Sequence, residues 1–74
     1  MEPNIKEVAG RIRALREDMD LTLQEMAEAT GRSTAEYAAQ ESGEEDLSFT
    51  FLYKCAEKFG VDVIELLTGE NPHL

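Results

Sequence analysis

The sequence predicts an all-α domain of five short helices. Three observations support this fold class: helix-capping residues recur along the chain, apolar residues between them repeat with the helical period, and no segment shows a sustained period of two. Glycines follow three of the apolar stretches, at positions where a left-handed residue ends a helix. The predicted helices span residues 5–19, 23–30, 34–42, 49–58 and 63–68.

The first predicted helix begins after Asn4, a capping residue that Glu7 follows three positions later. In such a pair each side chain can bond a free backbone N–H at the helix start. One apolar stripe runs along this helix and consists of Ile5, Val8, Ala9, Ile12, Leu15 and Met19. Arg16 lies about 20° from Ile5 around the helix, in the middle of the stripe, so its charge needs a partner in the core.

The second and third predicted helices form the most informative part of the sequence. Each begins with a complete capping pair, Thr22 with Glu25 and Ser33 with Glu36. Only residues 31–33 separate the two helices, and the first of these is a glycine, which permits a sharp turn. Two short helices joined in this way are typical of a helix-turn-helix, although a tight helical hairpin inside a bundle has the same pattern.

A buried ion pair is predicted between the first and third helices. Glu41 follows Tyr37 by four residues, so both lie on the inward face of the third helix. Because a charge aimed at the core is stable only when it is paired, Glu41 is the expected partner of Arg16. The alternative is that Arg16 contacts a phosphate of a nucleic acid. Gln40 is predicted to lie at the edge of a thin core.

The fourth and fifth predicted helices begin at Ser48 and at Asp62, the second of which has Glu65 three residues later. Cys55 lies on the apolar stripe of the fourth helix, so it is predicted to be a small buried hydrophobe and not a redox-active thiol. Tyr53 falls between the apolar positions. It is therefore expected to be exposed, where it can serve a partner surface.

The composition fits one small globular domain: the chain has 74 residues, 42% of them apolar and 31% charged. Residues 1–69 are assigned to the helix-turn-helix domain and residues 70–74 to a tail or the start of a linker. No apolar run is long enough to span a membrane and the N-terminus has no secretory pattern, so a reduced, cytoplasmic compartment is expected.

The sequence offers no chemistry for an enzyme. One cysteine and one histidine exclude an intrachain disulfide and a multi-ligand zinc site. The chain has no Cys–His pair in plausible reach and no glycine-rich phosphate loop. We therefore predict no catalysis, no cofactor and no metal.

Residues at fixed spacing extend the helix-turn-helix pattern along most of the chain. They are Arg11–Arg16, Leu21–Gly31, Ser33, Glu41, Gly43, Leu52, Lys54, Ala56, Phe59–Val61 and Glu65–Leu67. Over about residues 8–67 the chain resembles the Xre/Cro-type, phage-repressor-like helix-turn-helix family. The resemblance implies a lambda-repressor-like fold whose second and third helices form the helix-turn-helix. It also implies a bacterial transcriptional regulator that binds double-stranded DNA as a dimer.

The same resemblance indicates which residues would contact DNA. The third helix would enter the major groove. The residues expected at base edges are Thr34, Ala35 and Ala39, and the expected backbone contacts are Leu23, Gln24 and the loop 43–48. Thr34 can donate one hydrogen bond, whereas the alanines can only meet a thymine methyl group. The opening Leu-Thr-Leu of residues 21–23 is similar to a subgroup in which a C-terminal cupin sensor domain follows.

The charge departs from the pattern of that family. Sixteen acidic against seven basic residues give a formal net charge of −9, which opposes binding to nucleic acid. The acidic residues of the third helix and its following loop are Glu36, Glu41, Glu44, Glu45 and Asp46. The first helix partly offsets this acidic charge, because it carries the basic residues Lys6, Arg11, Arg13 and Arg16. Of these, Arg11 and Arg13 are predicted to contact DNA.

Two alternatives to DNA binding stay open. The same fold can serve as a protein–protein interaction module whose acidic face docks a basic partner, or as a mimic of DNA. The arrangement of charge separates these hypotheses. A basic face beside Thr34, formed by Lys6, Arg11 and Arg13, favours DNA binding. An acidic ring with no basic flank within a Debye length of roughly 8 Å favours the interaction module.

Overall fold

A computed structural model of the chain describes residues 4–70, which form five helices and, over that range, no strand. The helices are α1 (Ile5–Asp18), α2 (Leu23–Thr30), α3 (Thr34–Glu41), α4 (Phe49–Phe59) and α5 (Val63–Thr68). The predicted all-α fold class is confirmed, and each helix boundary lies within one residue of its predicted position. Apart from Glu70, the predicted tail lies outside the described residues.

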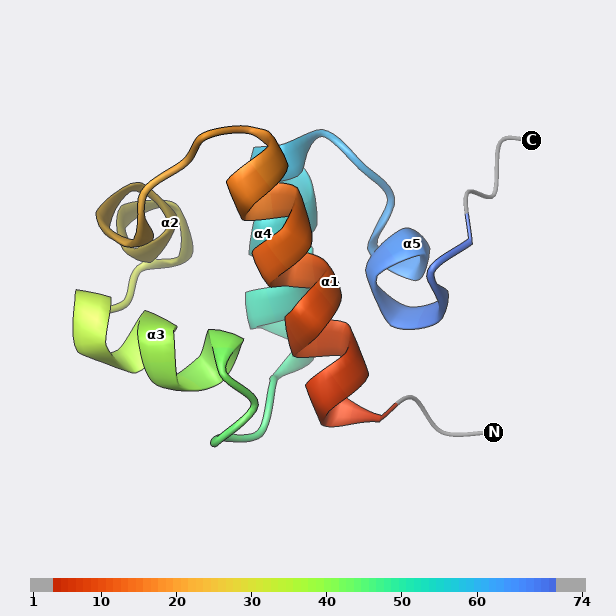
Figure 1. The fold of residues 1–74 in the computed structure, drawn as a ribbon, viewed down its shortest axis with the longest axis horizontal. Helices are drawn as coiled ribbons and strands as arrows, with labels where there is room; N and C mark the ends of the chain where they lie inside the picture. The colour runs from red at the N-terminus through yellow and green to blue at the C-terminus, as the bar shows by residue number, and fades with distance from the viewer. Residues whose placement is uncertain (1–3, 71–74) are drawn as a thin grey trace.

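The two long helices, α1 and α4, cross at the centre of the molecule, with α2 and α3 on one side and α5 on the other (Figure 1). α1 packs against both α3 and α5, and α2 packs against α3 and α4. The core cluster of buried residues is Val8, Ile12, Met26, Ala27, Tyr37, Phe51, Leu52, Cys55, Ala56, Phe59 and Leu66. All five helices contribute side chains to this single core. The position of α3 is therefore fixed by packing against residues from most of the chain.

The predicted caps begin every helix, but only two of them are reciprocal. At α2 the Oγ1 of Thr22 accepts from the Glu25 N–H at 3.0 Å and the Glu25 carboxylate accepts from the Thr22 N–H at 2.9 Å. α3 begins with the equivalent box. At α1 Asn4 caps in one direction only, and Glu7 instead lies 3.8 Å from the guanidinium of Arg11. Asp62 likewise accepts from Ile64 N–H without a return bond in the described structure.

The apolar stripe of α1 is shorter than predicted. Val8, Ala9 and Ile12 are buried, whereas Ile5 is 39% and Met19 43% exposed. Met19 is the residue at which the helix ends, so its side chain no longer follows the stripe. Only the central part of α1 therefore belongs to the core.

The predicted pair of Arg16 and Glu41 is present as a bidentate contact between α1 and α3. The Nε of Arg16 donates to Glu41 Oε2 at 2.8 Å and its Nη2 donates to Glu41 Oε1 at 3.1 Å. The third nitrogen, Nη1, donates to the carbonyl of Leu21 at 2.9 Å. Hydrogen bonding to Glu41 raises the pKa of Arg16 above its usual value, although partial burial opposes this. With all three nitrogens engaged, Arg16 is not available to a phosphate.

The surroundings of this pair are largely apolar. Tyr37 and Cys55 are fully buried, and burial raises the pKa of the Tyr37 phenol and the pKa of the Cys55 thiol, the latter to about 12. Cys55 is thus the buried hydrophobe that the sequence predicts. Gln40 lies deeper than predicted: it is 5% exposed, and its Oε1 has no hydrogen-bond partner among the described residues.

We expect an Arg16→Met substitution to lower the free energy of unfolding by about 3 kcal/mol, because it leaves the Glu41 carboxylate buried without a partner. The double variant Arg16→Met with Glu41→Leu should recover much of this loss. Urea denaturation followed by circular dichroism measures both values. The matched control is Arg13→Met, whose guanidinium is exposed and should change stability by less than about 0.5 kcal/mol. Equal stability of the wild type and Arg16→Met would contradict the structural role of the pair.

Candidate nucleic-acid interface

The turn between α2 and α3 is built around one left-handed glycine. Gly31 has a φ of 72°, and the N–H of Arg32 donates back to the Ala27 carbonyl at 2.9 Å, which closes the end of α2. Ser33 then caps α3. The guanidinium of Arg32 lies 5.3 Å from the centre of the Phe51 ring, which ties the turn to α4. These contacts hold α2 and α3 as one rigid helix-turn-helix.

The outward face of α3 carries only small, uncharged side chains. At about 100° per residue, positions 34, 38, 42, 35 and 39 follow one another around roughly 140° of the helix. They are Thr34, Ala38, Ser42, Ala35 and Ala39. Thr34, Ala35 and Ser42 are exposed, and the two remaining alanines are half-buried. We call these five residues the outward face of α3.

The two acidic residues of α3 both accept hydrogen bonds from within the chain, but only Glu41 is buried. Glu36 accepts from the Ser33 N–H at 2.9 Å, and this bond lowers the pKa of its carboxyl. Glu41 is buried against Arg16. Exposed acidic charge near α3 therefore lies at Glu36, in the first turn of the helix, and in the loop residues Glu44–Asp46 that follow it.

A hollow of about 220 Å³ lies between α1, α2 and α3. It is lined by Arg13, Arg16, Leu23, Ala38, Glu41 and Ser42. The Arg13 guanidinium is exposed and lies 3.6 Å from Glu17, a loose contact that leaves it free to meet another anion. Lys6 runs along the loop after α3, because a Cβ at Gly43 would lie 3.0 Å from its Cγ.

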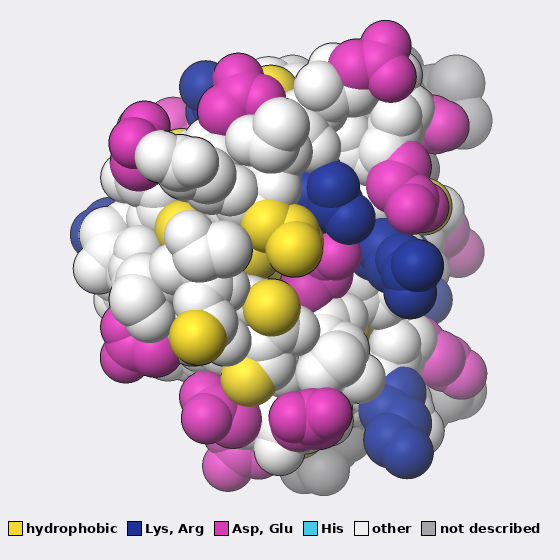
Figure 2. All heavy atoms as spheres, turned by 60° about the vertical axis from the view of Figure 1, so that its left-hand side comes forward, with side chains coloured by type: hydrophobic (Ala, Val, Ile, Leu, Met, Phe, Trp, Pro, Cys, Tyr) yellow, Lys and Arg dark blue, Asp and Glu magenta, His cyan; other side chains and the backbone are white. Residues whose placement is uncertain are grey.

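Figure 2 shows this side of the molecule. Hydrophobic side chains gather in the middle of the face, and most of the Lys and Arg side chains lie toward the right. Asp and Glu side chains lie above and below, among the basic side chains on the right, and next to the hydrophobic group in the middle. Basic groups also approach the helix-turn-helix from α4. The Nζ of Lys54 would lie 3.8 Å from a Cβ at Gly31, close to Arg32 in the turn. Basic residues thus lie near both ends of α3, where the exposed acidic residues Glu36 and Glu44–Asp46 also lie.

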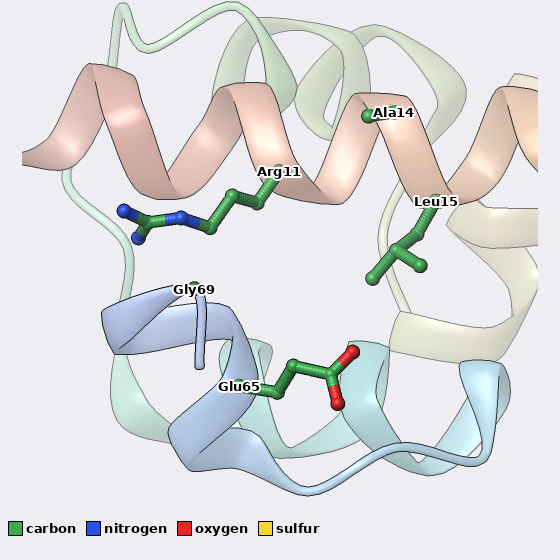
Figure 3. Close-up of a pocket in the computed structure, with 5 residues that line it drawn as sticks. All are labelled: Arg11, Ala14, Leu15, Glu65 and Gly69. Carbon is green, nitrogen blue, oxygen red and sulfur yellow. The ribbon is translucent and has the colours of Figure 1, made fainter. Parts of the chain in front are cut away.

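Arg11, predicted to act with Arg13, lies elsewhere. Its Nη1 donates to the carbonyls of Leu66 and Leu67, both at 3.0 Å, and caps the end of α5. Figure 3 shows its side chain directed over Gly69, at the rim of a hollow of about 250 Å³ between α1 and α5. Arg11 is predicted to contact DNA together with Arg13, but the structure directs its side chain to α5, because residues two apart point about 200° apart around a helix. Lys6 and Arg13, seven apart, share a side.

The other predicted contact residues lie at the helix-turn-helix. Gln24 is exposed on the second residue of α2, and Thr34 and Ala35 are exposed in the first turn of α3. Sequence reasoning missed Ala38 and Ser42, although their spacing from Thr34 places them on the same face. It also missed Arg32 and Lys54, whose approach to the turn depends on the packing of α4.

Comparisons with known proteins agree with this architecture. The helix-turn-helix domain family matches residues 9–72 of the chain. The clp gene regulator ClgR from Corynebacterium glutamicum is 30% identical over 89% of this chain and 87% of that one, with a TM-score of 0.78. A second structure of ClgR is 29% identical, with a TM-score of 0.80, over 90% of this chain and 72% of that one.

A third solved structure is similar in fold. It is the restriction-modification controller protein C.AhdI from Aeromonas hydrophila, at 22% identity and a TM-score of 0.78, covering 84% of this chain and 94% of that one. No curated protein matches the sequence. The match to a helix-turn-helix domain family agrees with the prediction that the chain is not an enzyme. Among the described residues no helix is long and apolar enough to cross a membrane, and no cluster of acidic, His or Cys side chains is arranged to hold a metal ion.

The capping boxes predict how stability responds to acid. Bonds from the Thr22 and Ser33 backbones lower the pKa of Glu25 and of Glu36 below the ordinary value of 4.5. Because the folded pKa is depressed, this stabilisation is complete above pH 4.5 and is lost as the pH falls below that value toward the folded pKa values. In thermal unfolding from pH 6 to pH 3, Glu25→Gln with Glu36→Gln should lose less stability than the wild type. Glu28→Gln, which removes an exposed acid of α2 outside the cap, is the control and should retain the wild-type loss.

Proposed function

The chain belongs to the helix-turn-helix domain family, as its Xre/Cro-type resemblance predicts, and from this premise we propose that it is the DNA-binding domain of a transcriptional regulator. ClgR, 30% identical, is by its name a regulator of clp genes, and the proposal extends a regulatory role to this chain. In the proposed complex, α3 lies in the major groove of double-stranded DNA. Thr34, Ala35 and Ala39 then face base edges.

The observation that carries this proposal is the neutral outward face of α3. A helix that enters the major groove approaches phosphates on both sides, so unpaired carboxylates on that face would oppose binding strongly. The five residues of this face are uncharged, Glu41 is buried against Arg16, and Glu36, which is exposed and caps α3, lies about 60° beyond Ala39 at the edge of the face. The net charge of −9 therefore does not describe the surface that would meet DNA.

The phosphate contacts that we propose come from both flanks of α3. Arg13 and Lys6 lie beside its C-terminal half, and Arg32 and Lys54 lie near the turn that precedes it. Gln24, exposed at the start of α2, can donate from its amide to a phosphate oxygen. Arg11 is not part of this set, because it caps α5.

Few cations face the DNA, so one copy is expected to bind weakly. We propose that two copies bind a two-fold operator, as helix-turn-helix dimers do. A sensor domain that follows this chain, such as a cupin barrel, would bind the regulatory ligand. The protein would act in the cytoplasm, where it meets the DNA.

A second candidate function is a protein-binding module, and the exposed loop Glu44–Asp46 favours it. This loop directly follows α3 and presents three consecutive acidic residues to solvent. A basic partner could dock there while α3 lies against its surface. The two functions differ in whether the chain selects a DNA sequence.

Selection from a random duplex pool tests the proposal, with a dimerised version of this chain at low and at physiological salt. We expect an enriched two-fold site whose affinity falls as salt rises, since phosphate contacts release counterions. Dimerisation ensures that a weak half-site does not escape detection. No enrichment at either salt concentration would refute DNA recognition and favour the protein-binding module.

An Arg13→Gln variant should weaken binding to the selected duplex about equally for all sequences. It should also reduce the slope of log affinity against log salt by about 1, the value expected for the loss of one phosphate contact. Fluorescence anisotropy titrations at four salt concentrations give both numbers. Arg11→Gln is the matched control: it removes the same charge from α1 at the α5 side, so the slope should stay unchanged. Equal slopes for wild type and Arg13→Gln would remove Arg13 from the interface.

A further inference from the structure

The outward face of α3 is apolar as well as neutral. Three of its five residues are alanines, and Ala38 lines the same hollow as Leu23 at the start of α2. Figure 2 shows hydrophobic side chains grouped in the middle of this side of the molecule. Methyl groups of Ala35, Ala38 and Ala39 therefore make up much of this outward face.

This face has little capacity for hydrogen bonds. The hydroxyl of Ser42 donates to the Ala39 carbonyl at 2.8 Å, which leaves Thr34 as the one free hydroxyl on the face. The amide of Gln40 points inward, since the residue is 5% exposed. Specific contacts to guanine usually require Arg or Lys, and those to adenine require Asn or Gln. The described outward face of α3 has none of these four residues.

Among the base edges of the major groove, thymine alone presents a methyl group. We infer that α3 reads the C5-methyl groups of thymines through Ala35, Ala38 and Ala39, and that Leu23 extends this contact from α2. The inference rests on the proposed function and adds the class of base that the site selects. Because alanine is short, it also allows the helix backbone to approach the groove floor more closely than long side chains would.

The distribution of larger hydrophobic side chains argues against a protein partner on this face. The large exposed ones are Ile5, Met19, Phe49, Tyr53 and Ile64. They belong to α1 and its end, α4 and α5, and none lies on α2 or α3. Protein interfaces are anchored by large side chains, above all Trp, Tyr and Arg, that fill pockets on the partner. Small methyl groups on a convex helix can instead fit against the shallow surface that successive base-pair edges form in the groove.

The test replaces thymine by uracil, which removes the methyl group and leaves the base-pairing edge unchanged. The full 74-residue chain is titrated with the enriched duplex and with copies in which single thymines are replaced. We expect an affinity loss of about fourfold at each thymine that α3 contacts, the size that burial of one methyl-sized group predicts. A 5-methylcytosine in place of cytosine at a contacted position, with guanine opposite, should bind more tightly than unmodified cytosine there.

Protein variants assign the effect to residues. In Ala35→Ser and in Ala39→Ser the ratio of affinities for thymine and uracil duplexes should fall toward one. Arg13→Gln is the control, because it should weaken both duplexes equally and keep the ratio. Circular dichroism verifies that each variant is folded, and Ala35→Ser is accommodated because residue 35 is exposed.

The outcomes separate the inference from the function on which it rests. An enriched duplex that binds equally with thymine or with uracil overturns methyl recognition and leaves the DNA-binding function standing. Failure to enrich any duplex overturns both. A thymine effect that persists unchanged in Ala35→Ser, in Ala39→Ser and in a third variant, Ala38→Ser, also overturns the inference, because it would place the methyl contacts outside α3.

Discussion

The buried contact of Arg16 with Glu41 ties α3 to α1 within the core that all five helices share. Arg16 bonds α3 through Glu41 and bonds the loop before α2 through the Leu21 carbonyl, so one guanidinium links three segments of the chain. A buried ion pair adds little stability over an apolar pair, but it is directional: its two parallel bonds allow one register of α3 against α1. The hollow beside this pair and the neutral face of α3 both follow from that register. A single contact thereby couples the helical core to the functional surface.

The second constraint on the structure is where the chain places its many acidic side chains. Glu25 and Glu36 are exposed but bonded in capping boxes at the starts of α2 and α3, Glu41 is buried against Arg16, and Glu44–Asp46 are exposed in the loop after α3. Carboxylates at helix starts also interact favourably with the helix dipole, so they stabilise the fold where they stand. A strongly acidic chain can therefore keep one face uncharged. Net charge alone is a poor guide to the partner of such a domain, since binding depends on the charges within a Debye length of the contact.

Much of the fold is local and was predictable from the sequence. Caps, glycine stops and apolar periods each depend on residues within one helix, and all five helices have the predicted bounds within one residue. The Arg16–Glu41 pair was also predictable, because each charge points inward on its own helix. The separation of Arg11 from Arg13 follows from their two-residue spacing, since residues two apart point to different sides of a helix. The depth of Gln40 and the approach of Lys54 to Gly31 depend on how whole helices pack, which no local pattern contains.

The central claim is that the chain meets DNA through the outward face of α3, between flanking cations on α1 and at the turn. Its most direct test is a titration of duplex DNA into the isotope-labelled chain, followed by backbone amide chemical shifts. The account predicts shifts at Thr34, Ala35, Ala39 and Ser42, at the start of α2 and near Arg13, with little change at Tyr53 and Ile64 on the α4 and α5 surfaces. Shifts confined to α4 and α5, or a spectrum unchanged by DNA at low salt, would contradict it.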